Sequence, residues 1–138
     1  MNIDAPKMIA MATAAAKNAY APYSKFSVGC CVVSESGEHF VGCNVENASY
    51  SLTVCAEASA ICQMVAAGQK RVRAMVLLSL SDEPCQPCGA CRQRLYEFSD
   101  ADTQLMICAG QNKPQQVRTY AMDDLLPRAF VLNEQEQK

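Results

Sequence analysis

Two short cysteine motifs, each at the start of a predicted helix, constrain this chain more than any other feature. They are TVCAE at residues 53–57 and PCGAC at residues 87–91. The free N–H groups at a helix start carry partial positive charge, which lowers the pKa of a thiol there and favours the thiolate. Cys88 and Cys91 lie three residues apart and therefore share a helix face. A thiolate from Cys55 would complete a three-ligand metal site, which requires the two helix starts to meet.

A site with three protein ligands points to catalysis. Catalytic zinc keeps its fourth position for water, whereas structural zinc fills all four positions with protein ligands. Glu57 follows Cys55 by two residues, near the metal with no need to bind it. That placement suits a general acid and base beside the water. A C-x-x-C pair alone also occurs in redox and structural zinc sites, but C-x-E followed after about thirty residues by P-C-x-x-C is far more specific.

The other cysteines are expected to have structural roles. The chain has nine cysteines, an odd number, and no sign of secretion, which argues against a disulfide framework. Cys43 lies on a strand that leads into a polar loop and is expected in the core. Four further cysteines lie in apolar runs and are expected to be inert core residues: Cys30, Cys31, Cys62 and Cys108.

Cys85 leaves alternatives open for the metal. With Cys88 and Cys91 it resembles part of an iron–sulfur run, or three ligands of a structural zinc, and a thiol redox protein could also use the last two. The residues that follow lack the x-x-x-Cys-Pro that completes the ferredoxin pattern. We therefore expect Cys85 in the loop before the site. His39, the only histidine, follows a hairpin turn and is expected at the surface, so the ligands should all be cysteines.

Composition narrows the class of partner. The 138 residues suit one domain, and half of them are hydrophobic. The net charge is -2, and Lys and Arg are scattered singly, without the basic patch expected of a nucleic-acid binder. No stretch approaches the roughly 18 apolar residues of a membrane span, and no signal core is visible. We expect a cytoplasmic protein with a small-molecule partner, and neither nucleic acid nor a membrane.

Hydrophobic periodicity predicts an α/β layered domain, because strands alternate with helices. Three helices and a last helical turn are predicted at residues 5–20, 55–67, 88–98 and 123–129. Strands are predicted at residues 26–33, 39–43, 73–80, 103–109 and 115–121. A polar loop at 44–53 is expected to lie over a site. We predict a single domain over residues 1–132, followed by a polar tail at 133–138.

Five stretches of this sequence match one known family. They are APYSKF at 21–26, GCNVENASY at 42–50, VCAE at 54–57, PCGACRQ at 87–93, and LLP at 125–127 ending at Phe130. From Tyr20 to Phe130 the chain resembles the small homotetrameric cytidine deaminases. The resemblance implies a three-layer α/β/α sandwich around a mixed five-stranded sheet. It also implies one Zn²⁺ per subunit on the three cysteines and a homotetramer with shared active sites.

The resemblance also implies a reaction and residues that bind the nucleoside. Asn44 and Glu46 match positions that bind the ribose hydroxyls, and Ala56 matches one whose backbone N–H reaches the pyrimidine carbonyl. Phe26 matches a ring that packs near the nucleoside. With Glu57 moving protons, the expected reaction is hydrolytic deamination of cytidine or 2'-deoxycytidine to the uridine and ammonia, in pyrimidine salvage. The alternative is another cytosine-containing substrate, such as a nucleoside antibiotic or an N4-modified cytidine.

The resemblance also concerns contacts between subunits and the positive charge near the metal ligands. Ala48 and Tyr50 match positions that reach a neighbouring subunit's site, and Phe130 matches an aromatic that stacks on the base across an interface. Most tetrameric members have Arg immediately after the catalytic glutamate, where this chain has Ala58. That Arg helps to neutralise the ligand thiolates. Arg92, which follows Cys91, is expected to compensate.

Overall fold

One mixed sheet forms the centre of the protein. The structure is a computed structural model that describes residues 2–110 and 116–132. The strand order is β2-β1-β3-β4-β5. The strands are β1 (Val28–Ser34), β2 (His39–Cys43), β3 (Val72–Ser79), β4 (Gln104–Ala109) and β5 (Arg118–Tyr120). β3 and β4 are parallel and the other neighbours are antiparallel, so the predicted mixed five-stranded sheet is confirmed.

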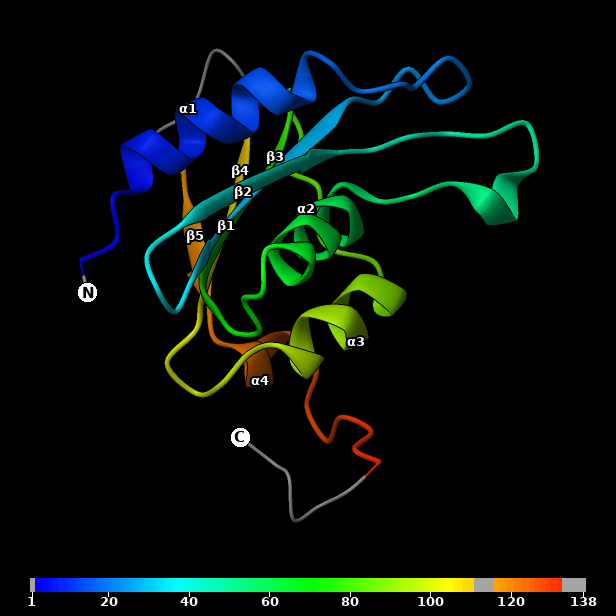
Figure 1. Ribbon diagram of the computed structural model, residues 1–138. Helices are drawn as coiled ribbons and strands as arrows, with labels where there is room; N and C mark the ends of the chain where they lie inside the picture. Colours follow the sequence, from blue (N-terminus) through cyan, green and yellow to red (C-terminus); the bar gives the residue numbers. More distant parts are fainter. Residues whose placement is uncertain (1, 111–115, 133–138) are drawn as a thin grey trace.

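Helices cover both faces of the sheet (Figure 1). On one face lies α1 (Ala5–Ala16), whose Met8, Ala12 and Ala16 are fully buried. On the other face lie α2 (Ala56–Ala66), α3 (Gly89–Glu97) and α4 (Met122–Leu125). Each face has its own buried hydrophobic cluster. The predicted three-layer arrangement is therefore confirmed.

The central strand β1 explains the uninterrupted apolar run in the sequence. All seven of its residues are buried. Cys30 and Val32 belong to the cluster under α2, whereas Cys31 and Val33 belong to the cluster under α1. Because successive side chains point to opposite faces, a strand covered on both faces needs apolar residues throughout.

Two glycines let the helices approach the sheet closely. A Cβ on Gly29 would lie 1.9 Å from the carbonyl oxygen of Ala12 on α1. A Cβ on Gly42 would lie 2.5 Å from the backbone nitrogen of Ala60 and 2.6 Å from the carbonyl oxygen of Ala56, both on α2. The backbone of α2 thus packs directly on β2. This contact fixes the first turn of α2, which carries Glu57, relative to the sheet.

The ends of the elements differ from the predictions where distant segments meet. The first helix ends at Ala16 instead of residue 20, because the Tyr20 backbone pairs with another segment. Its N–H donates to the Asn44 carbonyl at 3.0 Å, and its carbonyl accepts from the Glu46 N–H at 2.8 Å. The polar segment 44–53 is a loop as predicted, with one short 3₁₀ turn at Tyr50–Leu52.

The end of the chain is described only in part. The last helical turn lies at Met122–Leu125, before most of the predicted 123–129 segment. The predicted strand at 115–121 begins, within the described residues, at Arg118. The predicted tail at 133–138 lies outside the described residues. No described helix has the length and apolar character needed to cross a bilayer.

The cysteines outside the motifs follow the predictions in part. Cys30, Cys31 and Cys108 are buried as expected. Cys62 is exposed, so its prediction as a core residue is wrong: the buried side of α2 is formed by other residues, including Ile61 and Met64. Cys43 is half-buried rather than a full core residue. His39, expected at the surface, is also half-buried.

Candidate metal centre and active site

Two helix starts bring three thiols together. Cys55 is the N-cap residue of α2, Cys88 is the N-cap residue of α3, and Cys91 lies in the first turn of α3. Their sulfur atoms all lie within 4.8 Å of one another. Tetrahedral zinc with Zn–S bonds of about 2.3 Å needs sulfurs roughly 3.8 Å apart. The three thiols therefore fit a zinc ion after a small contraction.

The thiols influence one another's protonation. The pKa of Cys55 is lowered to about 6, chiefly because the Cys91 thiol donates a hydrogen bond to it, with smaller help from Cys88 and the positive charge of Arg94. The pKa of Cys91 is raised well above its ordinary value, because its thiol donates to Cys55 and because it is buried. Without a cation the cluster thus favours one thiolate. A metal ion that binds all three must displace the remaining protons.

Cys85 lies outside this three-thiol cluster. It is half-buried and packs against the hydrophobic cluster beneath α2. Burial raises the pKa of its thiol to about 11, with smaller contributions from the negative charges of Glu57, Cys55 and Cys88. Its position outside the cluster therefore separates Cys85 from the three proposed ligands.

Glu57 is a buried carboxyl group beside the cluster. It lies in the first turn of α2, and 4% of its surface is exposed. Burial raises its pKa from 4.5 to about 6, while its own backbone N–H and the Cys91 thiol oppose that rise by hydrogen bonding. A carboxyl group whose pKa is shifted toward neutrality can both accept and return a proton.

The two arginines on α3 have different partners. Arg92, expected beside the sulfurs, donates from Nε to the Pro87 carbonyl at 2.8 Å and from Nη1 to the Leu125 carbonyl at 2.7 Å. It therefore joins α3 to the preceding loop and to α4. Arg94 donates from Nη1 to the Cys91 sulfur at 3.7 Å. In this structure the contact to a ligand sulfur thus comes from Arg94.

The residues predicted to bind ribose lie just after the end of β2 and contact the start of β1 and the segment before it. The Asn44 amide accepts from the Val28 N–H at 2.9 Å and donates to the Phe26 carbonyl at 2.9 Å. The Glu46 carboxylate accepts from the Ser24 hydroxyl and from two backbone N–H groups, and these bonds lower its pKa. Phe26 is half-buried against the cluster beneath α2. A carboxylate has about four acceptor positions, so Glu46 retains capacity for a hydroxyl donor.

The residues predicted to reach a neighbouring subunit are exposed in the single chain. Ala48 is exposed, Tyr50 is 78% exposed, and Phe130 is 69% exposed. The Tyr50 ring contacts Tyr23 edge-on, with ring centroids 6.3 Å apart. The Phe130 carbonyl accepts from the Gln93 amide at 3.1 Å, which ties the segment to α3. By contrast, Ala56 is buried as the first residue of α2, where a helix has unpaired N–H groups.

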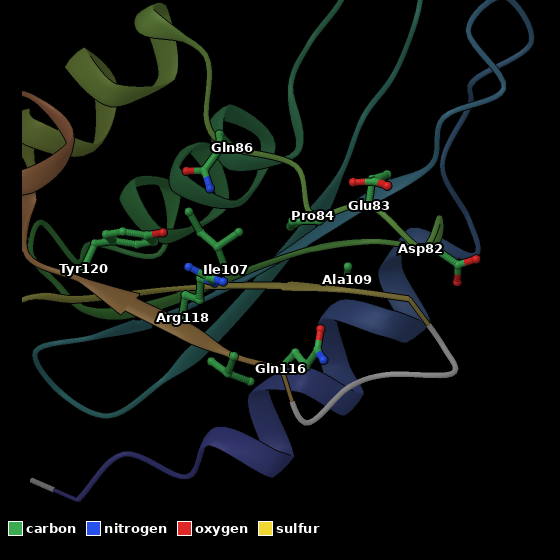
Figure 2. A pocket seen from close by; sticks show the side chains of 10 residues that line it. Asp82, Glu83, Pro84, Gln86, Ile107, Ala109, Gln116, Arg118 and Tyr120 are labelled. Atoms are coloured by element: carbon green, nitrogen blue, oxygen red, sulfur yellow. The ribbon is translucent and has the colours of Figure 1, made fainter.

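A separate cavity of about 620 Å³ lies beside β4 and β5 (Figure 2). Its lining includes Asp82, Glu83, Pro84 and Gln86 from the loop before α3, Ile107 on β4, and Arg118 and Tyr120 on β5. None of the cysteines or Glu57 lines it. This cavity is therefore distinct from the three-thiol cluster.

Comparison with known proteins decides the family. Residues 3–107, more than half of the chain, match the family described as the cytidine and deoxycytidylate deaminase zinc-binding region. The chain belongs to this family. The family's zinc-binding region and the cluster of Cys55, Cys88 and Cys91 agree, so the cofactor is zinc.

Members of the family match nearly the whole chain. The chain is 37% identical over 128 residues to the cytidine deaminase of Sporosarcina psychrophila, covering 93% of this chain and 92% of that protein. It is 40% identical over 123 residues to the cytidine deaminase of Mycobacterium tuberculosis, covering 89% and 86%. The crystal structure of the cytidine deaminase from Burkholderia pseudomallei superposes with a TM-score of 0.85 at 40% identity, over 93% of this chain and 100% of that one.

Two residues of the site region, Arg94 and Gly42, have contacts that the motifs do not assign to them. Arg94 lies three residues after Cys91, the spacing that places two residues on one helix face. Gly42 lies inside a predicted strand, where a glycine often marks a close backbone approach. Both signals are visible in the sequence, but only the structure shows which sulfur and which helix they meet.

Proposed function

We propose that this chain catalyses the zinc-dependent hydrolytic deamination of cytidine and 2'-deoxycytidine to the corresponding uridine and ammonia. The observation that carries the proposal is a buried Glu57 beside three thiols on the facing starts of α2 and α3. Family membership and full-length relatives named cytidine deaminase support the choice of substrate. The activity belongs to pyrimidine salvage in the cytoplasm.

In the proposed mechanism three cysteines bind the metal and Glu57 transfers the protons. Cys55, Cys88 and Cys91 hold the zinc, which supplies a Lewis acid with one open position that makes water acidic. Glu57 accepts a proton from the attacking water and passes it to N3 of the cytosine. After attack at C4, the Glu57 carboxylate takes the second proton from the new C4 hydroxyl group and delivers it to the amine, so that the C4–N bond breaks, ammonia leaves and the C4 carbonyl forms. Its burial suits this role, because a pKa near neutrality allows transfer in both directions.

The proposed nucleoside contacts come from segments next to the cluster. Glu46 and Asn44 bind the ribose hydroxyls, and the Ala56 backbone N–H binds the pyrimidine carbonyl. Phe26 packs near the nucleoside. Glu46 is already held by Tyr23 and Ser24, which preorganises its carboxylate without using all of its acceptor positions.

The proposed assembly is a homotetramer with shared active sites. Ala48, Tyr50 and Phe130 each contribute to a neighbouring subunit's site in this proposal. Their exposure supports it, because a side chain must be accessible on the single chain in order to reach a neighbouring subunit. Size-exclusion chromatography with light scattering measures the assembly, and a monomer that is fully active would contradict the shared site.

A spectrophotometric assay tests the activity. Purified, zinc-loaded protein is incubated with cytidine, and the change in absorbance that accompanies conversion to uridine is followed with and without a chelator. We expect conversion that stops when zinc is removed and returns when zinc is restored. No conversion of cytidine or 2'-deoxycytidine by protein shown to contain zinc would overturn the proposal.

A substrate panel distinguishes the alternative. Ala58 occupies the position where most tetrameric relatives have Arg, so a related cytosine-containing substrate is a second candidate. The panel contains cytidine, 2'-deoxycytidine, free cytosine and N4-methylcytidine. Faster turnover of N4-methylcytidine than of cytidine would favour the second candidate, whereas turnover of the two unmodified nucleosides alone would exclude N4-methylcytidine and free cytosine as substrates.

A further inference from the structure

The three proposed zinc ligands, as thiolates, would leave the zinc site with a net negative charge. Three thiolates exceed the charge of Zn²⁺ by one, and each excess negative charge makes the metal a weaker Lewis acid. Two helix N-termini provide partial positive charge, but they are shared among all the ligands. A full cation beside a ligand sulfur would restore neutrality.

Helix geometry places Arg94 in position to supply that cation. Arg94 follows Cys91 by three residues on α3, so the two side chains lie on the same helix face. Side chains on a helix lean toward its N-terminus, which directs the guanidinium of Arg94 back toward the cysteine. The resulting Nη1–Sγ distance is 3.7 Å. Its charge also acts on the neighbouring Cys55 and Glu57.

The other candidate positions do not provide this contact. Ala58 follows Cys55 by the same three residues on α2, but its methyl side chain carries no charge. Arg92 directs its recorded hydrogen bonds to the carbonyls of Pro87 and Leu125. Within the described ranges, 2–110 and 116–132, no other Arg or Lys donates a hydrogen bond to a ligand sulfur.

We propose that Arg94 is the positioning residue that neutralises the thiolate ligands in this chain, in the place of a cation on α2. It donates to Cys91 and withdraws electron density from that sulfur, which would keep the zinc acidic, and its positive charge offsets the excess negative charge of three thiolates, which would stabilise the zinc complex. The inference rests on the zinc ligands of the proposed function. It assigns the neutralising charge to α3, because the residue at the equivalent spacing on α2, Ala58, carries none.

Metal binding tests the role independently of catalysis. The variants are Arg94→Met, which removes the charge but keeps the aliphatic length, and Arg94→Lys, which restores a cation. Arg73→Met is the matched control, because Arg73 lies at the opposite end of β3 from the loop that leads to the site. Zinc affinity is measured by competition with a chromophoric chelator. The cobalt-substituted proteins report the sulfur-to-metal charge-transfer band.

We expect Arg94→Met to bind zinc about 10- to 100-fold more weakly, the range typical of lost groups that hydrogen-bond to metal ligands. Its cobalt charge-transfer band should move to longer wavelength, because the sulfur loses a hydrogen-bond donor. Arg94→Lys should recover at least a third of the lost affinity on a logarithmic scale, and Arg73→Met should remain within twofold of the parent. Arg94→Met with zinc affinity within twofold and an unchanged cobalt band would overturn the inference.

The two proposals fail in different ways. If the parent protein binds zinc and deaminates cytidine while Arg94→Met behaves like it, only the role of Arg94 is wrong. If the parent protein binds zinc without using the three cysteines, or lacks deaminase activity, the proposed function is wrong. Equal loss of affinity in Arg94→Met and Arg73→Met would identify a nonspecific effect of removing an arginine and would also overturn the inference.

Discussion

The starts of α2 and α3 meet at the same site but differ in burial and charge. The start of α2 is packed against β2 through Gly42, and Ala56, Glu57 and Ala58 are buried. The start of α3 is open: Cys88 is exposed, and a Cβ on Gly89 would meet nothing within 4 Å.

This difference indicates that the starts of α2 and α3 have different roles in the proposed reaction. The packed helix holds a carboxyl group whose pKa depends on burial, so it controls the proton. The open helix provides two of the three thiols and the arginine that contacts one of them, so we expect it to set the charge at the metal. Changes at the start of α2 should therefore affect turnover and packing, whereas changes on α3 should affect the metal.

The largest expected effect comes from Glu57→Gln. Removal of the proton carrier should lower cytidine turnover by about 100- to 10,000-fold, the usual range for a general acid and base. Zinc content should remain that of the parent, because Glu57 is not a proposed ligand. Steady-state kinetics and metal analysis measure both quantities, with Glu38→Gln in the exposed β1–β2 turn as the control. Turnover within threefold of the parent would exclude Glu57 as the proton carrier.

The packing of α2 should be broken by Gly42→Ala. The new Cβ would lie 2.5 Å from the backbone of Ala60, so the helix must move, at a cost of about 3 kcal/mol of unfolding free energy. Gly89→Ala on α3 is the matched comparison and should change stability by less than about 0.5 kcal/mol. Urea denaturation of the metal-free proteins measures both changes. Equal effects of the two substitutions would contradict the packed-versus-open distinction.

Arg92→Met should separate a structural arginine from the one near the metal. The variant loses hydrogen bonds from a charged group to the Pro87 and Leu125 carbonyls, which should lower stability by about 2 kcal/mol. In the metal-free protein, Arg94→Met should cost less than about 0.5 kcal/mol, since Arg94 is exposed. Thermal or urea denaturation tests the contrast. If Arg92→Met is neutral for stability but weakens zinc binding, the roles of the two arginines are exchanged.

The smallest expected effect is a pH dependence of the unfolding free energy of the metal-free protein. Burial raises the Glu57 pKa from 4.5 to about 6, so between these values the folded state holds a proton that the unfolded state has released. Stability therefore falls as pH rises through this window. Glu57→Gln lacks this loss and should be more stable than the parent by about 1–2 kcal/mol at pH 8, with no difference from this cause near pH 4. Parallel stability curves from pH 4 to 8 would contradict the buried, titrating carboxyl group.

Local rules predict much of the site. The three-residue spacing predicts that Cys88 and Cys91 share a helix face, and the C-x-E signature adds Cys55 as a third ligand; the structure brings the three sulfurs together. The layered fold follows from alternating strands and helices. The same three-residue spacing places Arg94 on the helix face of Cys91, although the sequence predicts this role for Arg92, which directly follows Cys91.

Features that depend on tertiary contact are harder to predict. The first helix ends at Ala16 because Tyr20 pairs with a segment more than twenty residues away. Cys62 lies in an apolar helix, and its exposure depends on which side of α2 meets the sheet. Arg92 lies beside a ligand in sequence, but its partners on the loop and α4 are set by the fold.

X-ray absorption at the zinc edge tests most directly the claim that three cysteines hold an open catalytic zinc. For the purified zinc protein we expect three sulfur neighbours at about 2.3 Å and one oxygen or nitrogen neighbour at about 2.0 Å. Cys85→Ser should leave this spectrum unchanged, because Cys85 lies outside the three-thiol cluster. Four sulfur neighbours that fall to three in Cys85→Ser would identify a closed structural site and contradict the account.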